Sequence, residues 1–344
     1  MKKILVIRLS SFGDIVLASP LLRALRTTYP LAQVDFLVKS QYADLVKFNP
    51  YITSVLEMRV GDWSELQLLL NRIQAERYDL VVDLHNSLRS RYIRLLSKAT
   101  RTVVINKRVF ARFALVKFKI NLYKAVIPVT ERYFETCEPF SVQDDNKGLE
   151  VFVPDQTIET ISSFMSKYKL ERYKVVVGFA PAAKHATKRW LPERYIELGT
   201  AIAKEYNARI IIFGGKEDET YCDDIAQMIN MQTGTHTAET LAGKLSLIET
   251  AAVLDYCNVV VSNDTGLMHL AQARGKKVVA IFGSTVKEFG FFPIASLSNV
   301  LEANEVECRP CSHIGRAECP KGHFLCMNSI QVDDVAKAVR EFVV

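Results

Sequence analysis

Short runs of β-branched and other apolar residues, each followed by a turn and a helical pattern, recur along this chain and constrain its fold more than any other feature. Such runs predict parallel strands that are covered on both faces. The expected strands are residues 3–8, 34–38, 80–84, 174–180, 209–213, 259–262 and 277–282, and the expected helices include 20–29, 267–273 and 332–344. The sequence therefore predicts an α/β protein whose ligands bind beyond the carboxyl ends of parallel strands.

The chain length predicts two domains, because 344 residues exceed the size at which one hydrophobic core keeps growing. A polar turn region at residues 142–155 is the best break between them. We expect Rossmann-like domains over residues 1–160 and 161–330, joined by a linker within residues 150–172. The last segment, residues 331–344, is expected to be a helix, and packing back on the N-terminal domain is one arrangement open to it.

Composition indicates an ordinary globular protein, with 49% hydrophobic and 24% charged residues, and argues against disorder. The apolar run at the start of the chain does not predict a signal peptide, because Arg8 and Asp14 interrupt it. No later stretch is long and apolar enough for a membrane span. We therefore expect a cytoplasmic protein whose seven cysteines are reduced thiols or metal ligands.

The charge distribution is more informative than the net charge of +6. Eleven Lys and Arg residues, among them Arg89 and Arg91, lie between Leu84 and Thr130, where no Asp or Glu occurs. Apolar and aromatic residues alternate with them, as on a basic amphipathic surface that meets anionic lipid or a phosphorylated acceptor. A solvated basic face is the alternative without function, and nucleic acid is a competing partner.

The loop after the first expected strand reads Ser10-Ser11-Phe12-Gly13-Asp14. Gly13 permits a tight turn or close approach of a ligand, and Asp14 stands at the start of a helix. Two roles remain open for Asp14. It can cap the helix, or it can act as a general base that takes the proton of an acceptor hydroxyl.

A second loop, residues 181–192, follows the strand at 174–180 and contains Lys188-Arg189-Trp190. Basic side chains beyond a strand end suit a diphosphate, and Lys188 is the best candidate, although a solvated surface lysine is the common alternative. We expect Trp190 to pack in the core rather than stack on a donor. Because no Asp-x-Asp motif occurs in the sequence, a leaving diphosphate would be neutralised by lysine and backbone amides rather than by a metal.

A third loop, residues 262–270, contains Asp264, Thr265, Gly266, Leu267 and His269. A strand, a turn of small residues and a helix leave the N–H groups of Thr265, Gly266 and Leu267 at a helix N-terminus, where an anion can bind. Asp264 would bind sugar hydroxyls or cap the helix. For His269, a place in the core is the stronger expectation.

A fourth loop, residues 213–219, places Asp218 and Glu219 after a pair of glycines. Acids in this position can accept hydrogen bonds from ribose hydroxyls. They can equally be acids in the first turn of a helix, stabilised by the helix dipole.

These motifs in this order resemble the lipopolysaccharide heptosyltransferase family, glycosyltransferase family 9. The resemblance rests on Gly13-Asp14 with Pro20, on Lys188-Arg189-Trp190, and on residues 263–266 with His269 and the segment 280–285. It implies the GT-B fold, in which two Rossmann-like domains with parallel sheets face a central cleft. It also implies transfer of heptose with inversion from ADP-heptose to the inner core of lipopolysaccharide, a lipid A-core acceptor.

The resemblance assigns roles to the same loops. Asp14 would be the catalytic base, and Lys188 would act on the diphosphate. The donor would also contact Asp264, Thr265, Gly266, Leu267 and His269, with Asp218 or Glu219 on the ribose. The acceptor, a lipid-linked phosphorylated glycan, would contact Ser10, Gly13, Arg89 and Arg91.

The enzyme would then be peripheral on the inner face of the inner membrane, with an anionic membrane surface as partner, no cofactor required for catalysis and no nucleic acid bound. The alternatives are a related transferase for another nucleotide-sugar and a non-catalytic nucleotide- or nucleic-acid-binding protein.

Four cysteines lie in the last loop of the sequence, and we call them the C-terminal cysteines: Cys308, Cys311, Cys319 and Cys326. A Cys-x-x-Cys pair with two further cysteines has the ligand chemistry of a structural zinc site. Free, packed thiols are the equal alternative. A catalytic metal is not expected.

Overall fold

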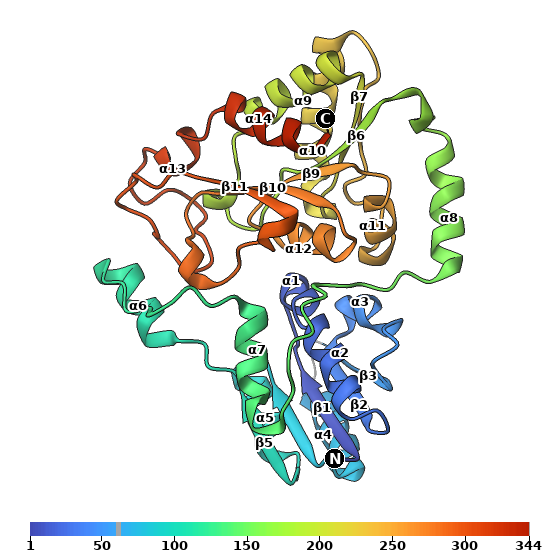
Figure 1. Ribbon diagram of the computed structural model, residues 1–344, viewed down its shortest axis with the longest axis vertical. Helices are drawn as coiled ribbons and strands as arrows, with labels where there is room; N and C mark the ends of the chain where they lie inside the picture. The colour runs from blue at the N-terminus through green and yellow to red at the C-terminus, as the bar shows by residue number, and fades with distance from the viewer. Residues whose placement is uncertain (60–62, 344) are drawn as a thin grey trace. The chain divides into compact units, whose positions relative to one another are not determined.

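The computed structural model of the protein describes residues 1–59 and 63–343, and these form two compact units. The N-terminal unit comprises Met1–Val109 and Ile127–Phe152, and the C-terminal unit comprises Phe110–Val126 and Val153–Val344. Each unit contains one sheet of parallel strands with helices beside it (Figure 1). The expectation of an α/β protein with two parallel sheets is confirmed.

The sheet of the N-terminal unit has five strands in the order β3-β2-β1-β4-β5. Its strands are β1 (Lys3–Ile7), β2 (Gln33–Lys39), β3 (Ser54–Met58), β4 (Leu80–Asp83) and β5 (Arg101–Val104). Its helices are α1 (Phe12–Val16), α2 (Ser19–Thr28), α3 (Asp44–Lys47), α4 (Trp63–Glu76), α5 (Leu88–Leu96) and α7 (Val129–Cys137), with short 3-10 turns at Ser40–Tyr42 and Glu138–Phe140. In the central strand β1, the apolar residues Ile4, Leu5, Val6 and Ile7 are all inaccessible to solvent, as expected for a strand covered on both faces.

The sheet of the C-terminal unit has six strands in the order β11-β10-β9-β6-β7-β8. Its strands are β6 (Val175–Ala180), β7 (Ala208–Ile212), β8 (Ala238–Thr240), β9 (Val259–Asn263), β10 (Lys277–Phe282) and β11 (Ser298–Glu302). Its helices are α8 (Asp155–Ser166), α9 (Pro192–Tyr206), α10 (Glu219–Thr233), α11 (Leu247–Leu254), α12 (Gly266–Ala273), α13 (Leu325–Asn328) and α14 (Val332–Val343), and α6 (Val109–Phe118) lies almost entirely in this unit. Short 3-10 turns lie at Leu170–Arg172, Ala186–Lys188, Lys216–Asp218, Lys287–Phe289 and Ala295–Leu297.

Local sequence explains where several helices begin and end. Pro20 and Pro192 stand in the first turns of α2 and α9, where a missing N–H costs nothing. Gly234 ends α10 with φ +69°, a left-handed conformation that glycine adopts without strain. Helix α11 begins with a reciprocal pair of hydrogen bonds between Ser246 and Glu249.

The units differ from the expected domains at three places. The chain passes from one unit to the other after Phe152 rather than at residue 160, and residues 110–126 group with the C-terminal unit instead of the N-terminal one. Helix α14 packs against α9, β9, β10 and β11, with Val335 and Val339 in the core of the C-terminal unit, so this helix belongs to that unit. The physical reason is its apolar face, which completes one side of that sheet. Residue 344 of the expected helix lies outside the described residues.

Each sheet has one position where neighbouring strands lead away in opposite directions. In the N-terminal unit it lies between β1 and β4, and in the C-terminal unit between β6 and β9. Loops that leave the carboxyl ends of such strands diverge and form the usual ligand site of open α/β sheets. Among the described residues, no helix combines the length and the apolar character needed to cross a membrane.

Candidate functional site

The loop after β1 holds Asp14 in an ion pair with Arg8, the residue that directly follows the strand. Arg8 Nη2 lies 2.6 Å from Asp14 Oδ1, and both side chains are nearly buried. The backbone N–H and the hydroxyl of Ser11 donate to the other carboxylate oxygen over 3.1 and 2.6 Å. The cap residue of α1 is therefore Ser11, and Asp14, as the third residue of the helix, accepts from it; these contacts fix the direction of its carboxylate.

The pKa of Asp14 lies below its ordinary value. Burial alone would raise the pKa, but the charge of Arg8 and the hydrogen bonds from Ser11 outweigh burial. Asp14 is therefore ionised at neutral pH, which is the form in which a carboxylate can accept a proton. Arg8 is held in turn by the carbonyl of Leu84 after β4, to which it donates a hydrogen bond.

The loop after β4 lies next to this pair in the sheet order and carries the other residues expected to bind an acceptor. Arg89 and Arg91 are exposed in α5, which begins at Leu88 with Ser87 as its cap. Ser10 is half-buried and Gly13 is buried in the loop after β1. All four residues thus follow the carboxyl ends of the adjacent strands β1 and β4.

Buried Asp83, at the end of β4, positions this loop. Its Oδ1 accepts hydrogen bonds from the N–H groups of His85 and Asn86 over 2.9 and 2.8 Å. Burial and the neighbouring charges of Arg8 and Lys107 lower the pKa of His85 to about 4. His85 is therefore neutral at pH 7.

In the C-terminal unit, Lys188 and Asp264 come together from the loops after the adjacent strands β6 and β9. Lys188 Nζ lies 2.6 Å from Asp264 Oδ2, and the same oxygen accepts a 2.6 Å hydrogen bond from the hydroxyl of Thr285. Thr285 follows β10, so three neighbouring strands contribute to this group. The structure therefore brings together two of the residues expected to bind a donor and adds a third.

Asn263 and Trp190 hold these two loops in register. The Asn263 side chain donates to the carbonyl of Pro181 over 2.6 Å and accepts from the N–H of Trp190 over 3.1 Å. The Trp190 ring is fully buried, and its indole N–H donates to the carbonyl of Ile330. The expected packing role of Trp190 is confirmed.

The start of α12 is accessible at the same edge of the sheet. Thr265 is the cap residue, and Thr265, Gly266 and Leu267 are half-buried. The first N–H groups of a helix have no partner within it, so they are available to an anion. His269, in contrast, is 4% exposed and packs inside the unit, as a core histidine does.

Asp218 and Glu219 have different surroundings. Asp218 accepts from the N–H of Gly215 over 3.1 Å and lies 3.4 Å from Arg189 Nη2, so it shapes the loop after β7. Glu219 begins α10 and lies against Gly243, where φ is +69°. A Cβ atom at Gly243 would come within 2.2 Å of Glu219 Oε1, so any other residue would displace the Glu219 side chain, and the positive φ itself favours glycine.

The C-terminal cysteines are free thiols, and Cys326 is buried while the other three are half-buried. Cys308 Sγ lies 3.8 Å from His323 Nε2. Within residues 1–59 and 63–343, no group of three or more His, Cys, Asp or Glu side chains is arranged to hold a metal ion. The structural zinc expected from the spacing of these cysteines stays a prediction.

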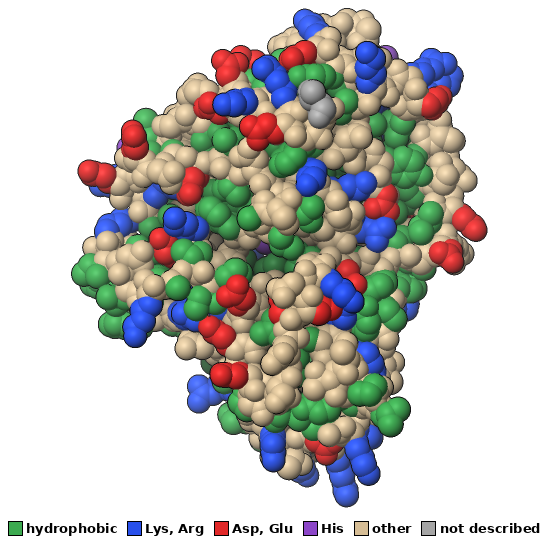
Figure 2. Space-filling model, viewed as in Figure 1, with side chains coloured by type: hydrophobic (Ala, Val, Ile, Leu, Met, Phe, Trp, Pro, Cys, Tyr) green, Lys and Arg blue, Asp and Glu red, His purple; other side chains and the backbone are tan. Residues whose placement is uncertain are grey.

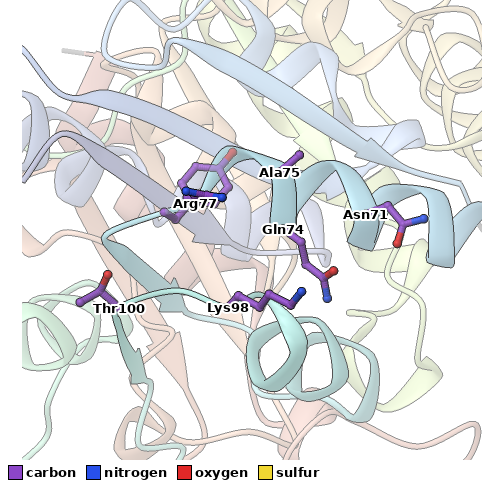
Figure 3. Close-up of a pocket in the computed structure, with 7 residues that line it drawn as sticks. Asn71, Gln74, Ala75, Arg77, Lys98 and Thr100 are labelled. Carbon is purple, nitrogen blue, oxygen red and sulfur yellow. The ribbon is translucent and has the colours of Figure 1, made fainter.

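A cavity of about 580 Å³ in the N-terminal unit lies elsewhere. Its lining residues come from the end of α4 and from the segments that precede β4 and β5, as Figure 3 shows for Gln74, Lys98 and Thr100. It therefore opens at the amino ends of these strands. Because parallel sheets bind ligands at the carboxyl ends, we assign the site to the loops and not to this cavity.

Arg8 and Thr285 are residues that the sequence patterns did not single out as functional. A charged residue at the end of an otherwise apolar strand was the available signal for Arg8. Thr285 stands at the end of the segment 280–285, which is part of the resemblance, but that segment gave it no role of its own. Neither pattern names a partner, and both residues acquire their roles from contacts with residues on other loops.

The chain matches known proteins over most of its length. A family model described as glycosyltransferase family 9 (heptosyltransferase) matches residues 67–321. Lipooligosaccharide heptosyltransferase 2 of Haemophilus influenzae is 27% identical over 299 residues, which cover 83% of this chain and 84% of that protein.

Two solved structures share the fold. Glycosyl transferase family 9 from Veillonella parvula has a TM-score of 0.82 at 22% identity, covering 99% of this chain and 97% of its own. The ADP-heptose lps heptosyltransferase II of Escherichia coli has a TM-score of 0.75 at 23% identity, covering 100% and 98%. With two parallel α/β sheets and a family match over more than half of its residues, the chain belongs to glycosyltransferase family 9, the heptosyltransferases.

Proposed function

We propose that this glycosyltransferase transfers heptose from ADP-heptose to the inner core of lipopolysaccharide, with inversion at the anomeric carbon and with Asp14 as general base. The observation that carries the proposal is the convergence of Lys188, Asp264 and Thr285 beside the start of α12. The names of the relatives support the substrates, since they describe a heptosyltransferase of lipooligosaccharide and an ADP-heptose enzyme.

On the donor side, the diphosphate binds at the N–H groups of residues 265–267 and at the ammonium of Lys188. The carboxylate of Asp264 holds that ammonium and accepts hydrogen bonds from sugar hydroxyls. Neutralisation by lysine and amides replaces a divalent ion, in keeping with the lack of an Asp-x-Asp motif in the sequence. Glu219 is the acid that we assign to the ribose, because Asp218 is already engaged by Gly215 and Arg189.

On the acceptor side, the ionised carboxylate of Asp14 takes the proton of the acceptor hydroxyl as its oxygen attacks the anomeric carbon. The bond from that carbon to the diphosphate breaks, and ADP leaves with the electron pair. A single displacement with a base and no enzymic nucleophile inverts the anomeric centre. Arg89 and Arg91 bind phosphate groups of the acceptor, and transfer takes place at the cytoplasmic face of the inner membrane.

A donor and acceptor screen tests the proposal. Purified protein is incubated with ADP-heptose, UDP-sugars or GDP-sugars, and with core acceptors that carry either no heptose or one. Transfer from ADP-heptose alone, with the opposite anomeric configuration in the product by NMR, is the expected result. Preference for another nucleotide-sugar, or retention of configuration, would refute it.

A further inference from the structure

An exposed segment of the C-terminal unit, residues 110–126, has a composition that its position in the fold does not explain. It comprises most of α6 and the chain after it, and we call it the amphiphilic segment. Its apolar side chains stand largely in solvent: Phe110 76% exposed, Phe113 54%, Phe118 59%, Ile120 54%, Leu122 46% and Val126 44%. So many large apolar side chains exposed within 17 residues mark an interaction surface rather than ordinary scatter.

The amphiphilic segment is fastened to the rest of the C-terminal unit by its polar groups. Lys119 Nζ donates to the carbonyls of Cys308 and Pro310 over 2.9 and 2.6 Å. Asn121 donates to Glu288 over 3.2 Å. The rings of Phe113 and Phe118 also contact each other, with centroids 5.7 Å apart. The segment therefore presents its apolar side chains from an anchored base.

Positive charge surrounds these apolar side chains. Arg112, Lys117, Lys119 and Lys124 lie within the segment, and it contains no Asp or Glu. Lys117 and Lys124 are exposed. Figure 2 shows hydrophobic side chains beside Lys and Arg on the part of the surface where Figure 1 draws α6.

We propose that the amphiphilic segment is a membrane-docking surface, which inserts its phenylalanines into the interface of an anionic bilayer while Lys117 and Lys124 contact lipid headgroups. Aromatic and aliphatic side chains flanked by Lys and Arg have the chemistry that binds such interfaces. This inference extends the proposed function, since a lipid-borne acceptor is reached at the membrane surface.

Two other occupants fit less well. Nucleic acid can stack on phenylalanine, but Ile120, Leu122 and Val126 gain nothing from stacking, whereas they gain from contact with acyl chains. A second copy of the chain, docked face to face, would bring the positive charges of the two segments together. The bilayer satisfies both the apolar and the basic side chains.

Vesicle flotation with the full chain tests the proposal. We expect the protein to float with vesicles that contain anionic lipid and to stay in solution with purely zwitterionic ones. Substituting F110S, F113S and F118S together should weaken partitioning roughly a hundredfold, and K117Q with K124Q roughly tenfold. The matched control combines L31S, L68S and M231S, which change side chains that are 98%, 68% and 74% exposed, and it should float like the unaltered protein.

Thermal unfolding checks that the variants are folded. If the triple phenylalanine variant does not fold, the lysine variant alone tests the docking surface. Unchanged flotation of the lysine variant and of the folded phenylalanine variant would overturn the proposal. So would binding of oligonucleotides without binding of vesicles, or a phenylalanine-dependent dimer that ignores vesicles.

Activity separates this inference from the proposed function. With a delipidated, water-soluble core acceptor, the phenylalanine variant should keep its turnover, whereas turnover on acceptor embedded in vesicles should fall. Vesicle binding without transfer from any ADP-sugar would refute the proposed function and leave the docking surface standing. Transfer to soluble acceptor without vesicle binding would support the proposed function and refute the docking surface.

Discussion

Replacing Asp14 with Asn removes the charge that we assign to the general base while keeping the size of the side chain. In the structure, Asp14 accepts from Arg8 on one oxygen and from Ser11 on the other. Asn retains a single acceptor oxygen, so one of these two sets of contacts is lost. If Asp14 takes the acceptor proton, turnover should fall by roughly two to four orders of magnitude.

The same substitution should also lower the free energy of unfolding. A hydrogen bond to a charged group contributes about 1.5–3 kcal/mol, and a buried charge left without any partner costs about 3–5 kcal/mol. Because Asn still offers one oxygen to Arg8, we expect a loss of about 2 kcal/mol.

The loss of stability should depend on pH in a defined direction. The pKa of folded Asp14 lies below its ordinary value of 3.8, so the ionised form stabilises the fold above that value. This stabilisation disappears as the pH falls through the lowered pKa of the folded state. The difference in unfolding free energy between the wild-type protein and Asp14→Asn should therefore be constant near neutrality and shrink below about pH 4.

The assay is steady-state transfer from ADP-heptose, measured beside chemical denaturation on the same samples. Asp35→Asn is the matched control. Asp35 lies in β2, is buried in the same unit, and accepts from the side chains of Gln33 and Tyr78. It should lose stability and keep turnover per folded molecule. Near-normal turnover of Asp14→Asn, with the expected loss of stability, would refute the assignment of the base.

Four further predictions concern Lys188, His85, Gly243 and the C-terminal cysteines. Lys188→Ala should lower kcat/KM by roughly 10²–10³, because the departing diphosphate loses its cation, and normal kinetics would exclude Lys188 from the reaction. Between about pH 6.5 and pH 4 the wild-type protein should lose stability as the pH falls, because His85 is protonated at a higher pH in the unfolded state than in the folded one. Chemical denaturation at several pH values should show a flatter pH dependence for His85→Gln. Gly243→Ala should destabilise the protein by at least about 1 kcal/mol, and it should weaken ADP binding in calorimetry because it displaces Glu219. An unchanged ADP affinity would contradict the assignment of Glu219 to the ribose. Treatment with EDTA should leave turnover unchanged, and elemental analysis of the purified protein should show about one zinc per chain if the C-terminal cysteines bind it.

The strands that the sequence patterns revealed differ systematically from those that they did not. All seven expected strands are present, within a residue or two of their expected ends. The four strands that were not expected, β3, β5, β8 and β11, are the two edges of each sheet. Edge strands are short or partly exposed, as β5 and β11 are, so they lack the continuous apolar run that marks a strand covered on both faces.

The expected site residues divide in a similar way. Asp14, Lys188, Asp264 and the start of α12 all follow the carboxyl ends of central strands, as the alternation of strands and helices predicted. Their immediate partners could not be predicted. Arg8 lies in no motif, and Thr285 has no assigned role within the segment 280–285. Both become important because a sheet places them beside a particular carboxylate.

The sequence by itself determined the parallel α/β class, the central strands, the loops that carry polar residues and the resemblance to a family that the comparisons then established. These properties depend on local periodicity and on short motifs, which the order of residues contains directly. Only the tertiary structure decided that Lys188 pairs with an acid 76 positions away, that residues 110–126 and α14 belong to the C-terminal unit, and that the charge of Asp14 is balanced by Arg8. Such pairings depend on which strands become neighbours and which apolar faces are buried together, and both are consequences of packing the whole unit at once.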